Sequence, residues 1–516
     1  MDTARAALPD LDTLDHEALK VLVREQYAQL LSHEAEIEHL KLLIAQLQRQ
    51  QFGRKSERVE RQIEQLEQRL EDLETSRAER PPAEKPETVA AGAAPRRPAR
   101  KPLPAHLPRE TQVYAPPHEA CPACGGVLRP FGEDVSEVLE YVPASFKVLR
   151  QVRPKLSCSG CERIVQAPAP SRPIERGLAG PGLLAQVLVA KYADHLPLYR
   201  QSEIYARSGV ELERSTLADW VGGASRLLAP LVEALRHYVM APGKVHADDT
   251  PVPVLAPGQG QTKTGRLWTY VRDDRPAGDT AAPAVWFAYS PDRKGEHPGR
   301  HLEGFRGVLQ ADAYAGFHHL YQDHQIQEAC CWAHVRRKFY DLQQAHASPL
   351  ATEAVQRIGQ LYDIEREIRG RSPDERKQAR QARARPVVDA MQTWFEVSLR
   401  KLSRKSDVAL AIQYALNRWT ALTRYLENGQ IEIDNNAAER ALRAVALGRK
   451  NYLFAGSDAG GERAALLYSL IGSAKLNGLD PEAYLREVLG RIADHPVNRI
   501  SELLPWHLAR AQPAKV

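Results

Sequence analysis

The sequence has few cysteines and no long hydrophobic run, and each shortage excludes a class of protein. Six cysteines among 516 residues are too few for a disulfide scaffold, which predicts a reducing, cytoplasmic setting. The longest strongly apolar stretch, residues 182–190, is interrupted at Gln186 and is far shorter than the roughly 20 residues that cross a bilayer. The first 20 residues are acidic and contain no apolar segment, so no secretory signal is expected. We predict a soluble protein with no membrane partner.

A strong excess of one charge is also missing. The chain has 70 Lys and Arg against 65 Asp and Glu, for a net charge of +5, which permits a nucleic-acid partner without indicating one. No GxxxxGK[ST] phosphate-binding loop occurs in the sequence. Charged residues at 26% and hydrophobic residues at 43% are typical of folded proteins, and the length predicts about three or four domains.

A heptad pattern runs through the N-terminal region. Apolar residues recur with heptad spacing between residues 19 and 47, and again between residues 59 and 73. This spacing predicts a helical zipper over residues 15–76 that joins copies of the chain into a homo-oligomer. Packing of the stripes on the chain's own core is the alternative. Residues 77–117 are rich in Pro, Ala and Arg and predict a disordered linker.

Two cysteine pairs with CxxC spacing follow the linker. Four thiolates suit a tetrahedral Zn²⁺, so we predict a structural zinc domain over residues 118–170. Four protein ligands leave no open position, which excludes zinc catalysis at this site. Lys155 belongs to a group of basic residues near the cysteines and is a candidate phosphate contact. The predicted zinc ligands are Cys121, Cys124, Cys158 and Cys161.

The next segment, residues 175–240, has a helical pattern. Residues 198–206 and 215–225, joined through a turn glycine, have the lengths of a helix-turn-helix, with Ser215 as the predicted N-cap of the second helix. We therefore predict a helical DNA-binding region. After it the pattern changes to short β-rich runs that predict a mixed sheet. These runs are residues 244–254, 266–271, 284–289, 307–312 and 327–332.

Carboxylates stand at conspicuous places in and after this sheet. Asp248 and Asp249 are adjacent in the first strand, where successive side chains point to opposite faces. Asp312 ends a later strand, and Glu439 lies near the start of a helix. Two carboxylates on a sheet and a third on a helix can hold two Mg²⁺ ions for phosphodiester chemistry. A capping box between Asn436 and Glu439 is the alternative explanation of the helix start.

Several motifs follow one another in a specific order. They are FGRKSER at residues 52–58, the four cysteines, HADDTP at 246–251, DAY at 312–314, CWAHVRRKF at 331–339 and DNNAAERALR at 434–443. In these motifs, from about residue 18 to 508, the chain closely resembles the transposases of the IS66 family of bacterial insertion sequences. The resemblance implies a multidomain α+β protein. Its catalytic domain would be ribonuclease H-like over residues 241–455 with a helical insertion at about 340–428, and a C-terminal helical element would cover 456–510.

The resemblance also implies a DDE active site. Its three acids map onto Asp248, Asp312 and Glu439, which would hold two Mg²⁺ or Mn²⁺ ions. In the family, Glu commonly follows the first catalytic acid, whereas in this chain Asp249 follows Asp248. Asp249 is therefore the alternative candidate for the first catalytic acid. Further candidate DNA contacts are Arg336, Arg337, Lys338, Arg440 and Arg443. Cys330 and Cys331 are expected to be small packed residues rather than metal ligands.

The implied reaction is hydrolysis at the element ends followed by strand transfer into target DNA. The implied partners are the terminal inverted repeats, the target DNA and accessory proteins of the same element. A DNA-binding regulator with an inactive nuclease site and a structure-specific nuclease of the same fold are the alternatives.

Overall fold

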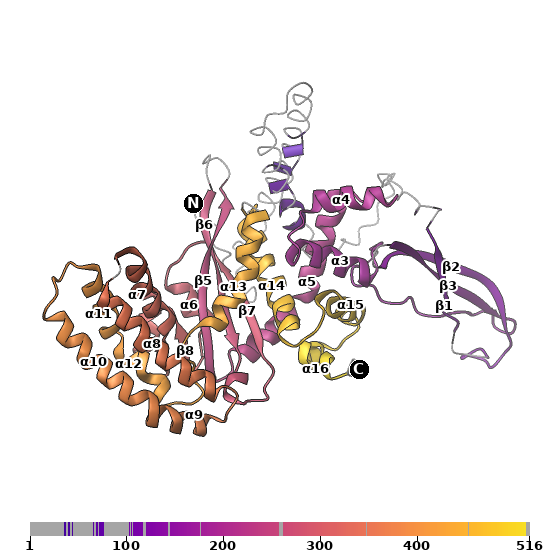
Figure 1. Cartoon of the computed structure of the whole chain (residues 1–516). Helices are drawn as coiled ribbons and strands as arrows, with labels where there is room; N and C mark the ends of the chain where they lie inside the picture. The colour runs from indigo at the N-terminus through magenta and orange to yellow at the C-terminus, as the bar shows by residue number, and fades with distance from the viewer. Residues whose placement is uncertain are drawn as a thin grey trace, which may run out of the picture.

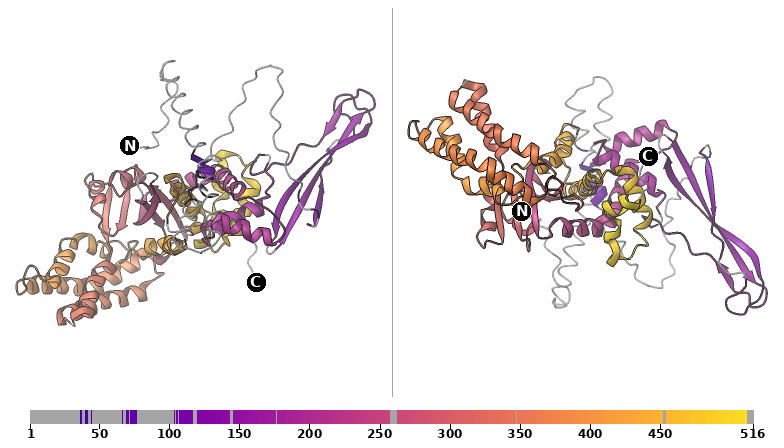
Figure 2. Two further views of the ribbon diagram at one scale, coloured as in Figure 1. Left: turned by 90° about the horizontal axis from the view of Figure 1, so that it is seen from above. Right: turned by 60° about the horizontal axis from the view of Figure 1, so that its bottom comes forward.

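The computed structural model describes residues 36, 37, 40, 41, 44, 66, 69, 70, 72–76, 103, 105, 107–116, 120–142, 145–175, 177–256, 262–346, 348–451 and 454–511. These residues form two separate sheets and a set of helices (Figure 1). Both views in Figure 2 place a helical insertion and a long β-hairpin at opposite ends of the molecule. The helices within this part of the chain include none long and apolar enough to span a bilayer.

The long hairpin carries the four cysteines at one of its ends. β2 and β3 pair antiparallel, β1 adds to β3 in parallel, and a bulge interrupts β2 between Pro130 and Gly132. Near the turn between β2 and β3, the N–H of Leu139 donates to the carbonyl oxygen of Leu178 at 2.6 Å, which ties the hairpin to the helical core. At about 3.3 Å per residue, the cysteines at the other end lie about 40 Å away. The strands are β1 (Arg109–Val113), β2 (Leu128–Val142), β3 (Ser145–Cys158) and β4 (Ile164–Gln166).

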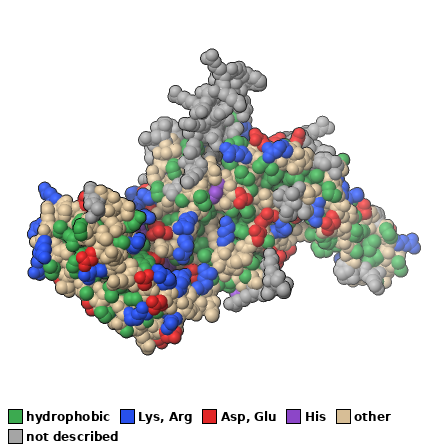
Figure 3. Space-filling model, in the orientation of Figure 1, with side chains coloured by type: hydrophobic (Ala, Val, Ile, Leu, Met, Phe, Trp, Pro, Cys, Tyr) green, Lys and Arg blue, Asp and Glu red, His purple; other side chains and the backbone are tan. Residues whose placement is uncertain are grey.

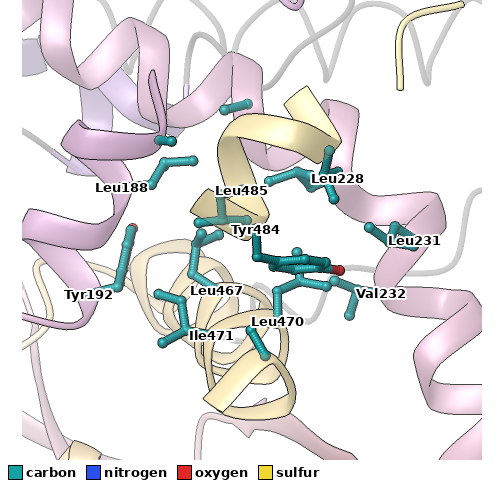
Figure 4. Packing of buried hydrophobic residues seen from close by; sticks show 14 of the residues in the cluster. Leu188, Tyr192, Leu228, Leu231, Val232, Leu467, Leu470, Ile471, Tyr484 and Leu485 are labelled. Atoms are coloured by element: carbon teal, nitrogen blue, oxygen red, sulfur yellow. The ribbon is translucent and has the colours of Figure 1, made fainter. Parts of the chain in front are cut away.

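The main hydrophobic core is made by helices from both halves of the chain. Figure 4 shows Tyr484 and Leu485 packed between Leu228, Leu467 and their neighbours, so C-terminal helices complete a core that N-terminal ones begin. The central helix, α5, runs for 26 residues and buries half its length. The helices are α3 (Pro181–Tyr192), α4 (Leu198–Arg207), α5 (Arg214–Val239), α14 (Asp458–Leu476), α15 (Pro481–Arg491), η6 (Val497–Leu503) and α16 (Pro505–Ala511).

The predicted helix-turn-helix needs a correction at its second helix. That helix begins at Arg214, its N-cap is Glu213, and Ser215 does not cap it. Trp220 and Val221 in its first turns are buried in the main core. Half of the residues of the helix expected to read DNA are buried, and DNA binding by this region stays a prediction.

The second sheet is mixed, as predicted. Its order is β7-β6-β5-β8-β9; β5, β6 and β7 pair antiparallel, and β5, β8 and β9 pair in parallel. All five predicted strands are present, and the largest difference is that β6 begins at Thr262 rather than at residue 266. The strands are β5 (Gly243–Leu255), β6 (Thr262–Arg272), β7 (Ala284–Ser290), β8 (Gly307–Ala311) and β9 (Ile326–Cys330).

Helix α14 covers the free edge of this sheet. The hydroxyls of Ser469 and Ser473 accept hydrogen bonds from the N–H groups of Phe287 and Val285 on β7, at 2.8 and 3.0 Å. Ser473 also donates to the carbonyl of Val285. Unpaired edge groups invite pairing with other chains, and these serines satisfy three of them on β7.

A helical insertion with its own core separates β9 from the last helix of the site. The helical run begins at Trp332, earlier than the predicted residue 340, because the chain turns directly from β9 into α7. After the insertion the chain returns to the sheet and enters α13 (Asn436–Asn451). The insertion contains α7 (Trp332–His346), α8 (Pro349–Ile368), α9 (Pro373–Ala379), the π-helical η4 (Arg380–Ala384), α10 (Arg385–Leu399), α11 (Asp407–Leu416), α12 (Trp419–Thr423) and η5 (Arg424–Leu426).

Only part of the predicted zipper lies among the described residues. There, Ile37, Leu40 and Ile44 pack against Leu70 and Leu73 of the same chain, and all five are buried. This contact is the intrachain alternative to self-association for these positions. Zipper-mediated oligomerisation therefore stays a prediction, and most of residues 15–76 and 77–117 lies outside the described part of the chain. The disordered linker predicted over residues 77–117 is wrong at its end, because β1 (Arg109–Val113) is a strand that pairs with β3.

Candidate active site

Asp248 lies in the middle of β5, opposite Thr269 of β6. Burial raises the pKa of its carboxyl group to about 7, and the negative charges of Asp312 and Glu439 act in the same direction. The N–H of Asp249 donates to Asp248 Oδ1 at 2.7 Å and opposes this shift. The structure therefore brings the three predicted acids into one neighbourhood, where they repel one another and no arginine or lysine contacts Asp248 among the described residues.

Asp249 has a different environment. Its side chain is only 2% exposed and lies between two arginines. Arg266 Nη1 donates to Asp249 Oδ2 at 3.0 Å, and Arg293 donates to Asp249 Oδ1 through Nε at 3.1 Å and Nη2 at 2.8 Å. Its negative charge is thus already matched within the protein.

Asp312 follows the last residue of β8 at a sharp turn. Its Oδ1 accepts from the N–H of Tyr314 at 3.2 Å, and Ala313 between them has φ of 61°. A positive φ is unfavourable for a residue with a Cβ and is often found where a functional side chain is held. The turn leaves the Asp312 side chain 23% exposed, with its Oδ2 3.9 Å from Arg293 Nη2.

The chain that returns from the insertion is fastened to the sheet before it enters α13. The Gln310 amide on β8 donates to the carbonyls of Glu432 and Asp434 at 2.6 and 3.0 Å, and the N–H of Glu432 donates to Gln310 Oε1. The N–H of Trp332 donates to the carbonyl of Ile433 at 3.0 Å. The segment thus runs beside β8, and this directs the first turn of α13 toward the ends of the central strands.

Asn435 anchors the start of α13 from within the protein. Its side chain donates to the carbonyl of Ala247 at 2.8 Å and lies 3.0 Å from His246 Nδ1, and both side chains are buried. Burial lowers the pKa of His246 to about 3, so the ring is neutral at physiological pH. The sequence contained both residues in its motifs but gave no signal that they pair across 189 positions.

The structure does not support the capping-box explanation of the helix start. The Asn436 side chain donates to Asp434 Oδ2 at 2.7 Å, and in this described region no hydrogen bond joins it to Glu439. Glu439 Oε1 lies 3.9 Å from His334 Nε2 on α7, and its side chain is 38% exposed. The carboxylate is therefore partly accessible, and its charge acts on Asp248.

The basic residues predicted to contact DNA differ in whether they are exposed or paired with an acid of the protein. Arg336, Arg337 and Lys338 are exposed on α7, and Arg440 and Arg443 are exposed on α13. Figure 3 shows Lys and Arg side chains gathered over the middle of one face, between the helical insertion and the long hairpin. Lys155 instead pairs with Asp134 at 2.6 Å. Its charge is thus matched within the hairpin.

The four cysteines cluster as predicted. Their sulfur atoms lie 3.3 to 3.5 Å apart in three pairs, all four ligand atoms fall within 4.8 Å of one another, and all four thiols are free of disulfides. A Cβ on Gly126 would lie 3.0 Å from Cys158 Sγ, so any larger side chain would crowd the cluster. A backbone N–H of Ala123 lowers the pKa of Cys121 to about 6. The spacing of the four sulfur atoms suits Zn²⁺.

Two smaller groups of metal-type ligands occur among the described residues. One combines Cys331 and His334 with Glu439, and the other combines Asp292, Glu296 and His297. Burial raises the pKa of Cys331 to about 12, and its sulfur accepts from the N–H of Asn435 at 3.2 Å. Cys330 and Cys331 are both buried, as predicted for small packed residues.

Comparison with known proteins assigns the chain to a family. Residues 176–463 match the family described as Transposase IS66 family, and residues 469–506 match the IS66 C-terminal element. Residues 118–162 match the zinc-finger binding domain of transposase IS66. Residues 39–111 match a family described as Transposase C of IS166 homeodomain.

Whole-length relatives support the same assignment. The protein named Uncharacterized protein y4hP from Sinorhizobium fredii is 43% identical over 505 residues, which cover 92% of this chain and 90% of the relative. Uncharacterized protein y4qI from the same organism is 41% identical over 484 residues, covering 91% and 89%. With a catalytic-domain match over more than half of its length, the chain belongs to the IS66 family of transposases and carries the leucine-zipper, zinc-finger and DDE catalytic domains of that family.

Proposed function

We propose that the protein cleaves DNA at the ends of its insertion sequence and joins the freed ends to target DNA, with Asp248, Asp312 and Glu439 as the catalytic acids. The observation that carries this proposal is the convergence of the three acids from β5, the end of β8 and the first turn of α13. The strand order, with three antiparallel strands followed by two parallel ones, supports a ribonuclease H-like domain.

The environment of the two adjacent aspartates supports Asp248 over Asp249 as the first acid. Asp249 is buried and bound by Arg266 and Arg293, so a cation would have to displace two arginines to reach it. Among the residues that the structure describes, Asp248 has no such partner, and it keeps a raised pKa. A carboxylate with unmatched charge is the one that gains most from a metal ion.

The three acids fit two Mg²⁺ or Mn²⁺ ions, because carboxylate oxygens are the ligands that hard cations prefer. When bound, the ions supply activation of the attacking water or 3′ hydroxyl and stabilisation of the leaving oxygen. Asp248 must release its proton before it can act as a ligand. Asn435 and His246 hold the first turn of α13 against β5, which fixes the direction from which Glu439 reaches the site.

The four-cysteine end of the hairpin is proposed to hold one structural Zn²⁺. Its place far from the catalytic sheet suits a role in binding DNA outside the cleavage position. The partners proposed are the terminal inverted repeats, the target DNA, further copies of the chain and accessory proteins of the same element. The exposed arginines of α7 and α13 are the proposed DNA contacts nearest the acids.

The test is cleavage of labelled DNA that carries the ends of the element. Purified protein is incubated with Mg²⁺ or Mn²⁺, and wild type is compared with Asp312→Ala and with Asp363→Ala, an exposed acid of the helical insertion. Nicking and joining by wild type and by Asp363→Ala, but not by Asp312→Ala, supports the proposal. Cleavage without joining indicates a nuclease, and specific binding without any cleavage indicates a regulator.

A further inference from the structure

Arg293 stands at the edge of the carboxylate site in the loop between β7 and α6 (Glu296–His301). Two of its nitrogens, Nε and Nη2, donate to Asp249 Oδ1 at 3.1 and 2.8 Å. Its guanidinium carbon lies 4.1 Å from the centre of the Tyr314 ring, which is within the range of a cation–π contact. One edge and one face of the guanidinium are therefore fixed by the protein.

The other edge of this guanidinium is open. Nη1 makes no hydrogen bond to any residue that the structure describes, the side chain is 39% exposed, and Nη2 lies 3.9 Å from Asp312 Oδ2. Arg380 in the helical insertion shows what a structural arginine looks like in this chain. It is 0% exposed, and Nε, Nη1 and Nη2 all donate to carboxylate or carbonyl oxygens.

The loop that carries Arg293 is locked against the loop that follows Asp312. The Tyr314 hydroxyl donates to the carbonyl of Arg293. A Cβ on Gly295 would lie 2.8 Å from the carbonyl oxygen of Gly316, and a Cβ on Gly316 would lie 2.2 Å from the Tyr314 ring. Both positions therefore require glycine. The guanidinium is held beside Asp312 by packing that any larger side chain would disrupt.

Asp249 does not use up the positive charge around it. It carries one negative charge against the two positive charges of Arg266 and Arg293, and the second positive charge lies beside Asp312, whose Oδ2 is 3.9 Å from Arg293 Nη2. A phosphodiester in reaction places negative charge on its nonbridging oxygens, and a guanidinium fixed in advance stabilises that charge.

We propose that Arg293 binds a nonbridging oxygen of the scissile phosphate, and that Asp249 and Tyr314 are positioning residues that hold its guanidinium. This inference rests on the proposed cleavage function. It gives the aspartate next to Asp248 a task of its own, which is to fix the arginine rather than to bind a metal ion.

The first test reads DNA contact without catalysis. In metal-free buffer, ethylation of individual phosphates in the element ends is used to find the phosphates that binding requires. With wild type, ethylation of the scissile phosphate is expected to weaken binding about tenfold, the effect of losing one charged hydrogen bond. With Arg293→Ala that penalty is expected to vanish, while penalties at other phosphates remain. An equal penalty in both proteins, or none in wild type, overturns the inference.

The second test reads cleavage at saturating DNA. Arg293→Ala is expected to lower the rate about 10²-fold, with partial recovery in Arg293→Lys and on addition of guanidinium ion, whereas Arg366→Ala, an exposed arginine of α8, should match wild type. Asp249→Asn should lower the rate less than Arg293→Ala. If wild type cleaves and Arg293→Ala cleaves equally well, the inference fails. If wild type does not cleave, the proposed function fails, and the ethylation pattern still decides the role of Arg293.

Discussion

The helical insertion and the carboxylate site both bury charge, but they arrange it in opposite ways. In the insertion, Glu365 accepts from Arg380 at 2.7 Å and from Arg376 at 3.3 Å, and Arg376 also binds Glu432 at 2.8 Å. All these side chains are buried or nearly so, and each negative charge meets a positive one. In the site, Asp248 is surrounded by further carboxylates instead.

The ion pairs of the helical insertion hold the carboxylate site in place. Arg376 donates to the carbonyl of Gly429, and Arg380 donates to those of Tyr425 and Asn428. These carbonyls belong to the segment that leads back to α13 and Glu439. Matched charges inside the insertion thus fix the path of the chain, whereas the unmatched acids are kept free for a ligand. The same principle explains the cysteine cluster, where four potential thiolates gather around one point.

The largest effect is expected at the cysteine cluster, where four potential thiolates depend on a bound ion. Cys158→Ser removes one of the four zinc ligands, so the protein is expected to lose about one zinc per chain. The effect is large because structural zinc sites contribute on the order of 10 kcal/mol to local folding. Metal analysis of the purified variant checks this. The catalytic core should remain folded, since the hairpin is tied to it at the opposite end through Leu139. Cys330→Ser, a buried cysteine outside the cluster, should retain the zinc.

Breaking the paired arrangement is expected to be the next largest effect. Glu365→Gln keeps the shape of the side chain but leaves Arg380 with a buried, unmatched charge, which typically costs about 3 to 5 kcal/mol. Unfolding in guanidinium chloride measures this loss. The matched control is Glu367→Gln. Glu367 lies two residues after Glu365 on α8, and this variant breaks its exposed ion pair with Arg383. If both variants unfold at the same denaturant concentration, burial of the Glu365 pair does not matter for stability.

The sequence could predict the strands but not these supporting contacts, and the catalytic role of the three acids stays a prediction. Alternation of apolar residues and the position of Asp312 at a strand end are local patterns, and β8 was predicted almost to the residue. The pairing of His246 with Asn435 spans 189 positions, and Arg293 lies in no motif. Glu365 and Glu367 look alike in a list of residues, and only the packing of α8 decides which of them is buried.

Neutralising the unpaired arrangement is expected to stabilise the protein. The pKa of Asp248 is raised from 3.8 to about 7, so the folded state binds an extra proton between about pH 4 and pH 7, and stability falls as the pH rises through that window. Asp248→Asn removes this loss. In EDTA its unfolding free energy should exceed that of wild type by about 4 kcal/mol at pH 8 and match it near pH 4. A variant that is less stable at pH 8 would show that Asp248 is matched by a charge after all.

The smallest effect concerns exposed charges, where the same contrast between matched and unmatched groups should appear in DNA binding. Lys155 is paired with Asp134 at 2.6 Å, whereas Arg443 is exposed on α13 and makes no ion pair with any described residue. Arg443→Ala should reduce the salt dependence of DNA binding by about one phosphate contact. Lys155→Ala should reduce it less, because binding there must first separate Lys155 from Asp134. Affinities measured between 50 and 200 mM salt, roughly the range in which such contacts are lost, compare the two. A larger change in the salt-dependence slope for Lys155→Ala would mean that DNA displaces Asp134 from Lys155. Pairing with an acid would then not identify a structural residue on this surface.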